Sequence, residues 1–161
     1  MRVVGVDPGL ASIGLGFVES RGSRLVHLGH HLVTTSPDDD PATRLLRISQ
    51  EVQRVCSTYG PEVAAVEALY FAKNISSAIP VAQARGAIIV ALAQHGIPVH
   101  DYSPPQIKQA IVGTGGASKH QIGELVALLL GLGSSRPDEH AADALACAIC
   151  HLHAVGGGVP A

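Results

Sequence analysis

The chain has 161 residues, enough for one domain with a sizeable core, and its 3% aromatic content means that Val, Ile, Leu and Ala must build that core. No stretch is apolar for long enough to cross a bilayer, no signal-peptide pattern stands at its start, and three cysteines favour a reducing compartment, so we expect a cytoplasmic protein without membrane contact. The net charge of -2 is weak evidence against nucleic-acid binding, since a binding groove depends on local rather than total charge.

The first half of the chain predicts four strands and one helix. Strands are expected at about residues 2–6, 12–19 and 24–33. The polar turn at Ser20–Ser23 joins the second and third of them into an antiparallel hairpin. A helix follows over about residues 41–58, with apolar residues at helical spacing, and Gly60-Pro61 ends it. The fourth strand then ends at Glu67.

The second half predicts four helices and one strand. A helix over about 75–95 is closed by Gly96, and a short strand follows at 97–100. Pro104-Pro105 opens a short helix that the Gly113–Gly116 run breaks. Ser118 with Gln121 resembles a capping box for the next helix, and Pro137-Asp138 starts the last one. This order predicts one α/β domain over residues 1–155, a mixed five-stranded sheet with helices on both faces, and a disordered tail at 156–161.

Four residues far apart in the sequence are candidate ligands of a divalent metal. Asp7 and Glu67 each end an apolar strand, and the first and fourth strands tend to be neighbours in such sheets. His140 and Asp143 are three residues apart, so they share one face of the last helix. A carboxylate at the tip of an apolar strand is costly unless a positive group meets it. Oxygen donors of this kind describe a Mg²⁺ or Mn²⁺ site.

Simpler interpretations exist for several of these residues. The sequence Asp7-Pro8-Gly9, taken alone, is more often only a turn, and Glu67 could end its strand at the surface. Asp138 and Glu139 are better explained as acidic residues favoured at a helix N-terminus than as ligands.

Two other motifs invite functional interpretations that we do not favour. Cys147 and Cys150 form a C-x-x-C, but no second ligand pair for zinc lies near Cys56, and redox motifs of this type occur at helix N-termini. We interpret both cysteines as small buried residues of a helix. The Gly113–Gly116 run lacks the Lys-Ser/Thr spacing of a nucleotide-binding P-loop.

Several segments together resemble the RuvC family, the bacterial Holliday junction resolvases. They are Val6-Asp7-Pro8-Gly9, Val66–Asn74, Gln83-Ala84-Arg85-Gly86, Gln106-Ile107-Lys108-Gln109 and Ala142-Asp143-Ala144-Leu145-Ala146. They occur in order between residue 3 and about residue 153. The resemblance implies an RNase H-like fold and a homodimer that binds four-way DNA junctions and nicks two strands of like polarity symmetrically with Mg²⁺ or Mn²⁺. It also implies work with a branch-migration complex of the RuvA and RuvB type.

The resemblance also assigns roles to individual residues. Asp7, Glu67 and Asp143 match the metal-binding carboxylates, and His140 stands where most members have a fourth carboxylate. We expect two ions per site. Mn²⁺ should be favoured over Mg²⁺, because Mn²⁺ accepts imidazole more readily as a ligand. Lys119 is expected to stabilise charge on the scissile phosphate. The expected DNA contacts are Lys108 on the backbone, Tyr70 stacked on an opened base, Lys73 and Arg85.

Two other functions remain open at this stage. An RNase H-like nuclease acting on RNA or RNA–DNA hybrids would carry the same carboxylates. A non-catalytic junction-binding module would be expected to lack one of them, and three are present. An actin-like ATPase also begins with an apolar strand ending in Asp-x-Gly, but this chain is too short for its two lobes.

Overall fold

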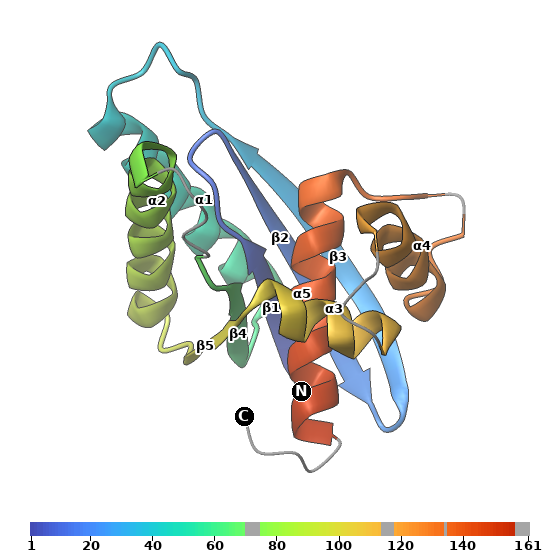
Figure 1. Cartoon of the computed structure of the whole chain (residues 1–161). Helices are drawn as coiled ribbons and strands as arrows, with labels where there is room; N and C mark the ends of the chain where they lie inside the picture. Colours follow the sequence, from blue (N-terminus) through green and yellow to red (C-terminus); the bar gives the residue numbers. More distant parts are fainter. Residues whose placement is uncertain (70–74, 114–117, 134, 157–161) are drawn as a thin grey trace.

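The computed structural model describes residues 1–69, 75–113, 118–133 and 135–156 (Figure 1). The strands are β1 (Arg2–Asp7), β2 (Ser12–Arg21), β3 (Arg24–Thr34), β4 (Val63–Glu67) and β5 (Val99–Tyr102). The helices are α1 (Pro41–Tyr59), α2 (Ile75–Gln94), α3 (Pro104–Val112), α4 (Lys119–Leu129) and α5 (Glu139–Gly156). The predicted order of elements is therefore confirmed. Of the disordered tail expected at 156–161, Gly156 is instead the last residue of α5, and 157–161 lie outside the described residues.

The five strands form one mixed sheet in the order β3-β2-β1-β4-β5. The first three strands are antiparallel neighbours, whereas β1, β4 and β5 run parallel. Helices α1 and α2 cover one face and α3, α4 and α5 the other, which confirms the predicted architecture (Figure 1). Among the described residues, no helix combines the length and the apolar character needed to span a membrane.

One predicted boundary was wrong. We expected a strand at residues 97–100, but β5 runs from Val99 to Tyr102. The amide of Ile97 donates to the carbonyl of Leu92, so this residue still belongs to the turn that ends α2. Gly96 adopts a left-handed conformation, with φ of 68°, at this turn. The shift matters because it places Tyr102 beside Glu67 at the end of the sheet.

Helix α5 rests directly on the sheet because three glycines lie beneath it. A Cβ atom added at Gly5 would lie 1.9 Å from the carbonyl oxygen of Ala144, and one at Gly14 would lie 2.0 Å from that of His140. At Gly16 it would lie 2.7 Å from the amide nitrogen of Leu145. Only glycine permits so close an approach of helix backbone to strand. The helix is thereby held over β1 and β2 at a fixed height.

Candidate active site

Asp7 and Glu67 meet at the carboxyl edge of the sheet. Strands β1 and β4 pair in parallel, with Val6 beside Val66, so the next residue on each strand is a carboxylate. Helix α5 packs across this edge, and its residues His140 and Asp143 line the same cavity as the two carboxylates. Three elements that are distant in the sequence therefore converge on one place, as the strand and helix spacing predicted.

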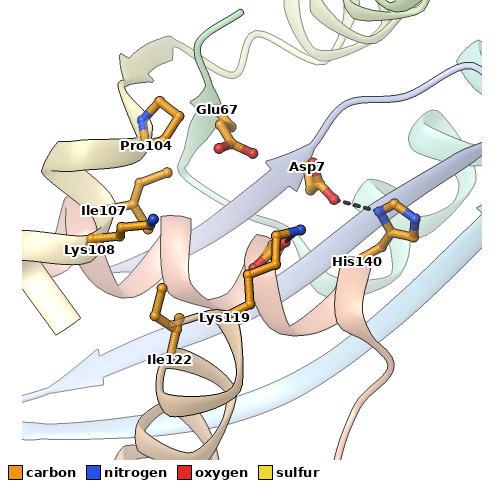
Figure 2. Close-up of a pocket in the computed structure, with 9 residues that line it drawn as sticks. Asp7, Glu67, Pro104, Ile107, Lys108, Lys119, Ile122 and His140 are labelled. Carbon is orange, nitrogen blue, oxygen red and sulfur yellow. Dashed lines mark hydrogen bonds and ion pairs between the residues drawn. The ribbon is translucent and has the colours of Figure 1, made fainter. Parts of the chain in front are cut away.

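These side chains line a cavity of about 260 Å³. Its lining residues are Asp7, Glu67, Pro104, Ile107, Lys108, Lys119, Ile122, His140 and Asp143. Figure 2 shows Glu67, Asp7 and His140 projecting toward a common space, with the two lysines approaching from α3 and α4. The cavity thus combines acidic groups, ammonium groups and two isoleucines.

Two carboxyl groups of the cavity, Glu67 and Asp143, have a raised pKa. Burial raises the pKa of Glu67 to about 7, and the neighbouring charges of Asp7 and Asp143 add to this shift. Burial also raises the pKa of Asp143, although the Lys119 ammonium opposes that change. Crowded, half-buried carboxylates of this kind are destabilised when they ionise, and a bound cation relieves that cost.

The ammonium group of Lys119 lies beside these carboxylates. Lys119 begins α4, whose N-terminus is fixed by a capping box between Ser118 and Gln121. Its Nζ bonds to Glu139 and lies 3.6 Å from Oδ2 of Asp143. The hydrogen bond to Glu139 raises the pKa of Lys119, which therefore stays charged. Glu139, which we expected to serve only the helix N-terminus, is thus also a partner of the cavity's ammonium.

His140 contacts a carboxylate of the cavity directly. Its Nδ1 lies 2.7 Å from Oδ2 of Asp7 (Figure 2), and about half of the side chain is exposed. A histidine whose other nitrogen is held by a carboxylate is oriented for a fixed role. The sequence spacing identified this residue correctly as one that faces the carboxylates.

The donor set is suited to a divalent cation, although it is not assembled as a finished cage. Within the residues that the structure describes, no three His, Cys, Asp or Glu side chains already surround a point that could hold an ion. The Asp7–His140 and Asp143–Lys119 contacts engage oxygens that a metal would need. The chemistry of the set nonetheless fits, since it offers three carboxylates and one imidazole whose excess negative charge is only partly neutralised.

The remaining predicted DNA contacts are placed differently from one another. Lys108 lines the cavity from α3. Arg85 does not, because its guanidinium bonds to Asp101 of β5 and its side chain is only 18% exposed. Its Nε is buried without a hydrogen-bond partner among the described residues. Tyr70 and Lys73 lie outside the described residues.

The interpretation of the C-x-x-C motif is confirmed. Cys147 and Cys150 are free, buried thiols in α5. Burial raises the pKa of Cys150 to about 11 and that of Cys147 well above its usual value. Both side chains are therefore protonated packing residues at neutral pH.

Comparison with known proteins identifies the family. A sequence model described as crossover junction endodeoxyribonuclease RuvC matches residues 3–151. The chain belongs to the RuvC family. A crossover junction endodeoxyribonuclease RuvC from Treponema pallidum (strain Nichols) is 46% identical over 151 residues, which cover 94% of this chain and 77% of that protein. The RuvC of Roseiflexus sp. (strain RS-1) is 47% identical over 95% of this chain and 91% of its own length.

Solved structures agree with this assignment. Thermus thermophilus RuvC matches with a TM-score of 0.89 and 38% identity, covering 98% of this chain and 97% of that one. T. thermophilus RuvC in complex with a Holliday junction substrate matches with the same TM-score and 35% identity, covering the same shares of both chains. The yeast mitochondrial resolvase Ydc2 shares the fold, with a TM-score of 0.66 over 92% of this chain and 76% of its own, and 15% identity. The predicted family, its RNase H-like fold and its Holliday junction endonuclease activity are therefore confirmed.

Proposed function

We propose that this RuvC-family chain resolves four-way DNA junctions by paired symmetric nicks at a two-metal site formed by Asp7, Glu67, His140 and Asp143. The observation that carries the proposal is the convergence of three carboxylates from β1, β4 and α5 on one cavity with Lys119. A junction-binding module without catalysis would not need three carboxylates at one point, because ionisation of Glu67 and Asp143 in this half-buried cavity costs stability.

The reaction we propose is hydrolysis. Water attacks the scissile phosphorus in line and gives up a proton to the solvent. The bond to the 3′-oxygen breaks, and that oxygen takes up a proton from the solvent and leaves as a hydroxyl. When bound, divalent ions lower the pKa of water and stabilise both the attacking and the leaving oxygen. Asp7 would help to hold the ions, because it lies at the end of the central strand and lines the same cavity as Glu67 and the residues of α5.

The two lysines of the cavity serve the DNA in this proposal. Lys119 is close enough to Asp143 to place its ammonium at the phosphate under attack, where it stabilises the developing negative charge. Lys108 lies on α3 at another wall of the cavity and is suited to hold a neighbouring phosphate. Ile107 and Ile122 give the cavity an apolar wall, beside which charge interactions are stronger than in open water.

A second copy of the chain is part of the proposal, because two symmetric nicks need two sites. Helix α2 supports it with an exposed stripe at helical spacing made of Ile79, Ala82, Gly86 and Val90. Ile79 is 54% and Val90 56% exposed, and the stripe carries no charge. Exposed apolar helix faces of this kind usually mark an interface. The branch-migration partners of the RuvA and RuvB type rest on family membership alone.

The decisive experiment is cleavage of a synthetic four-way junction with Mg²⁺ or Mn²⁺, followed by mapping of the cuts on all four strands. We expect two nicks at symmetric positions in strands of like polarity. An RNA–DNA hybrid serves as the competing substrate. Preferential cleavage of the hybrid would identify an RNase H-type enzyme, and binding without cleavage would identify a non-catalytic module.

Tyr70 remains a prediction from sequence for the DNA contact. If its ring stacks on an opened base, Tyr70→Ala should lose about 1–3 kcal/mol of that contact and slow cleavage. Tyr70→Phe keeps the ring and should cleave like the parent. Equal damage by both substitutions would show that the hydroxyl matters, and the stacking role would be wrong.

A further inference from the structure

A buried hydrogen bond joins β5 to α5 beneath the cavity. The hydroxyl of Tyr102 and Nδ1 of His151 lie 2.8 Å apart, and the two residues are only 4% and 3% exposed. The stretch of α5 just before His151, residues 144–150, consists only of Ala, Leu, Cys and Ile. A polar pair is costly to bury in such surroundings unless its geometry is well satisfied, so the bond is a strong local constraint.

The state of the imidazole fits this bond. Burial lowers the pKa of His151, and the nearby His100 ring, whose centroid is 5.0 Å away, lowers it further. The ring is therefore neutral at pH 7, and its Nδ1 can accept the proton of the phenol while Nε2 carries the ring hydrogen. Burial likewise raises the pKa of Tyr102, which keeps the phenol protonated and able to donate.

Tyr102 is linked to three walls of the cavity. Tyr102 pairs with Glu67 in the sheet. Its carbonyl oxygen accepts a hydrogen bond of 2.9 Å from the amide of Ala68, the residue that follows Glu67. The next residue, Ser103, caps α3, the helix that carries Lys108. The hydroxyl of Tyr102 bonds to His151 of α5, and Asp143 lies eight residues, or about two turns, before His151 on the same helix.

We propose that Tyr102 and His151 are positioning residues of the nuclease: their hydrogen bond fixes the carboxyl ends of β4 and β5 against α5 and so sets the separation of Glu67 from Asp143. The other polar contacts of this end of α5, from Cys150 and His153, go to carbonyl oxygens of α3 and not to the sheet. The core contacts of α5 with β4 and β5 are otherwise mainly apolar and non-directional, so they constrain the position of the strands less sharply. A hydrogen bond is directional and constrains that position more sharply. The inference rests on the proposed metal-binding role of Glu67 and Asp143.

The test compares Tyr102→Phe, which removes only the hydroxyl, with Ile48→Val, a fully buried substitution on the opposite face of the sheet. The free energy of unfolding of both variants is first measured with denaturant, so that any loss of stability is known. Binding of Mn²⁺ without DNA is then measured by electron paramagnetic resonance of the free ion. Cleavage is followed as a function of Mn²⁺ concentration, and hydrogen exchange reports the protection of the Ala68 amide.

We expect Tyr102→Phe to bind Mn²⁺ about three- to tenfold more weakly, less than the roughly 10- to 100-fold typical of a group bonded directly to a metal ligand. Its cleavage rate at saturating Mn²⁺ should stay within about twofold of the parent, and its Ala68 amide should exchange faster. Ile48→Val should bind Mn²⁺ like the parent. Parent-like binding by Tyr102→Phe, or an equal loss in Ile48→Val, would show that the bond contributes stability alone and overturn the inference.

A second pair of variants tests the other partner. His151→Asn keeps a polar atom near the position of Nδ1, whereas His151→Leu removes it, so Asn should retain more of the Mn²⁺ affinity than Leu. Equal loss in both would overturn the inference, and if Leu fails to fold, the comparison of Asn with the parent decides in its place.

Asp143→Asn separates the two proposals. If it binds Mn²⁺ like the parent, the metal site itself is wrong; if it binds weakly while Tyr102→Phe is unaffected, only the positioning role is wrong.

Discussion

The two faces of the sheet carry very different cores. The face covered by α1 and α2 is filled mainly with aliphatic side chains, such as Ile48, Val52, Ile88 and Leu92. That face also holds the ring of Phe17 and the thiol of Cys56. The face covered by α5 holds Tyr102, two buried thiols and a buried histidine, and the three carboxylates lie at its rim. One layer of side chains thus serves stability, while the other gives up part of that stability to hold polar groups in fixed positions.

The largest expected effect is the loss of chemistry on the α5 face. Asp7→Asn removes one negative charge and one ligand from the cavity while leaving its lysines in place. We expect cleavage of a four-way junction to fall by at least about 100-fold, with junction binding largely retained in a gel-shift assay. Ile48→Val on the other face should cleave like the parent. Loss of folding or of binding in Asp7→Asn would contradict the role assigned to this carboxylate.

A second large effect should come from the contact between α5 and the sheet. Gly5→Ala places a methyl group 1.9 Å from the carbonyl oxygen of Ala144, so the helix must move away. We expect a loss of about 3 kcal/mol in the free energy of unfolding, together with loss of cleavage as His140 and Asp143 shift.

Gly123→Ala is the matched control for this substitution. Its position in α4 has open space around the added methyl group. It should raise the free energy of unfolding by about 0.5–1 kcal/mol, because alanine is the better helix former. Similar stability of both variants in urea unfolding would mean that α5 does not rest on this glycine.

The same comparison explains what could be predicted from sequence. The strand order, the pairing of β1 with β4 and the convergence of Asp7, Glu67, His140 and Asp143 follow from local patterns and from general rules of α/β topology. Periodicity and the residues at strand ends carry this information directly, so the convergence of these four side chains could be predicted before the structure.

The rest depends on contacts between distant segments, which a single sequence does not reveal. No local pattern shows that Gly5 and Gly14 lie directly beneath α5, or that Arg85 forms an ion pair with Asp101. Glu139 matched a helix N-terminus equally well before Lys119 was seen beside it. The Tyr102–His151 bond joins residues 49 positions apart, and neither residue stands in an informative motif.

The choice of metal should separate the imidazole from the carboxylates of the cavity. His140 offers nitrogen, which Mn²⁺ accepts more readily than Mg²⁺ does. We therefore expect faster junction cleavage with Mn²⁺ than with Mg²⁺ at equal concentration. His140→Asp should narrow the difference by restoring an all-oxygen set. Rates with Mg²⁺ equal to those with Mn²⁺ in the parent would indicate that His140 acts through Asp7, to which it is bonded, and not on the ion.

The stability of the metal-free protein should depend on pH through Glu67. Its pKa is raised to about 7 in the folded state, so its contribution to stability is present below its ordinary pKa and lost as pH rises through about 7. Glu67→Gln cannot ionise and should therefore be the more stable protein at pH 8 in a chelating buffer. Because the side chain is partly exposed, we expect about 1 kcal/mol, or roughly 2–4 °C in Tm.

Adding Mn²⁺ should reverse this order. The ion binds the folded parent and raises its Tm, whereas the variant has lost a ligand and should respond much less. Scanning calorimetry at pH 5 and pH 8, with and without the ion, measures all four states. A variant no more stable than the parent at pH 8 would show that Glu67 is ionised there without penalty.

The smallest expected effect concerns Glu139, which shares Lys119 with Asp143. In Glu139→Gln the ammonium loses its charged partner, so it should lie closer to Asp143 and compete with a metal ion for that carboxylate. We expect Mn²⁺ binding without DNA to weaken by about two- to threefold, since both partners are exposed. The same substitution in a Lys119→Met background should have no effect, because nothing remains to be redirected. An equal loss in both backgrounds would mean that Glu139 acts on the ion through its charge alone. High salt would then weaken the effect in both backgrounds alike, because an exposed charge is screened whether or not Lys119 is present.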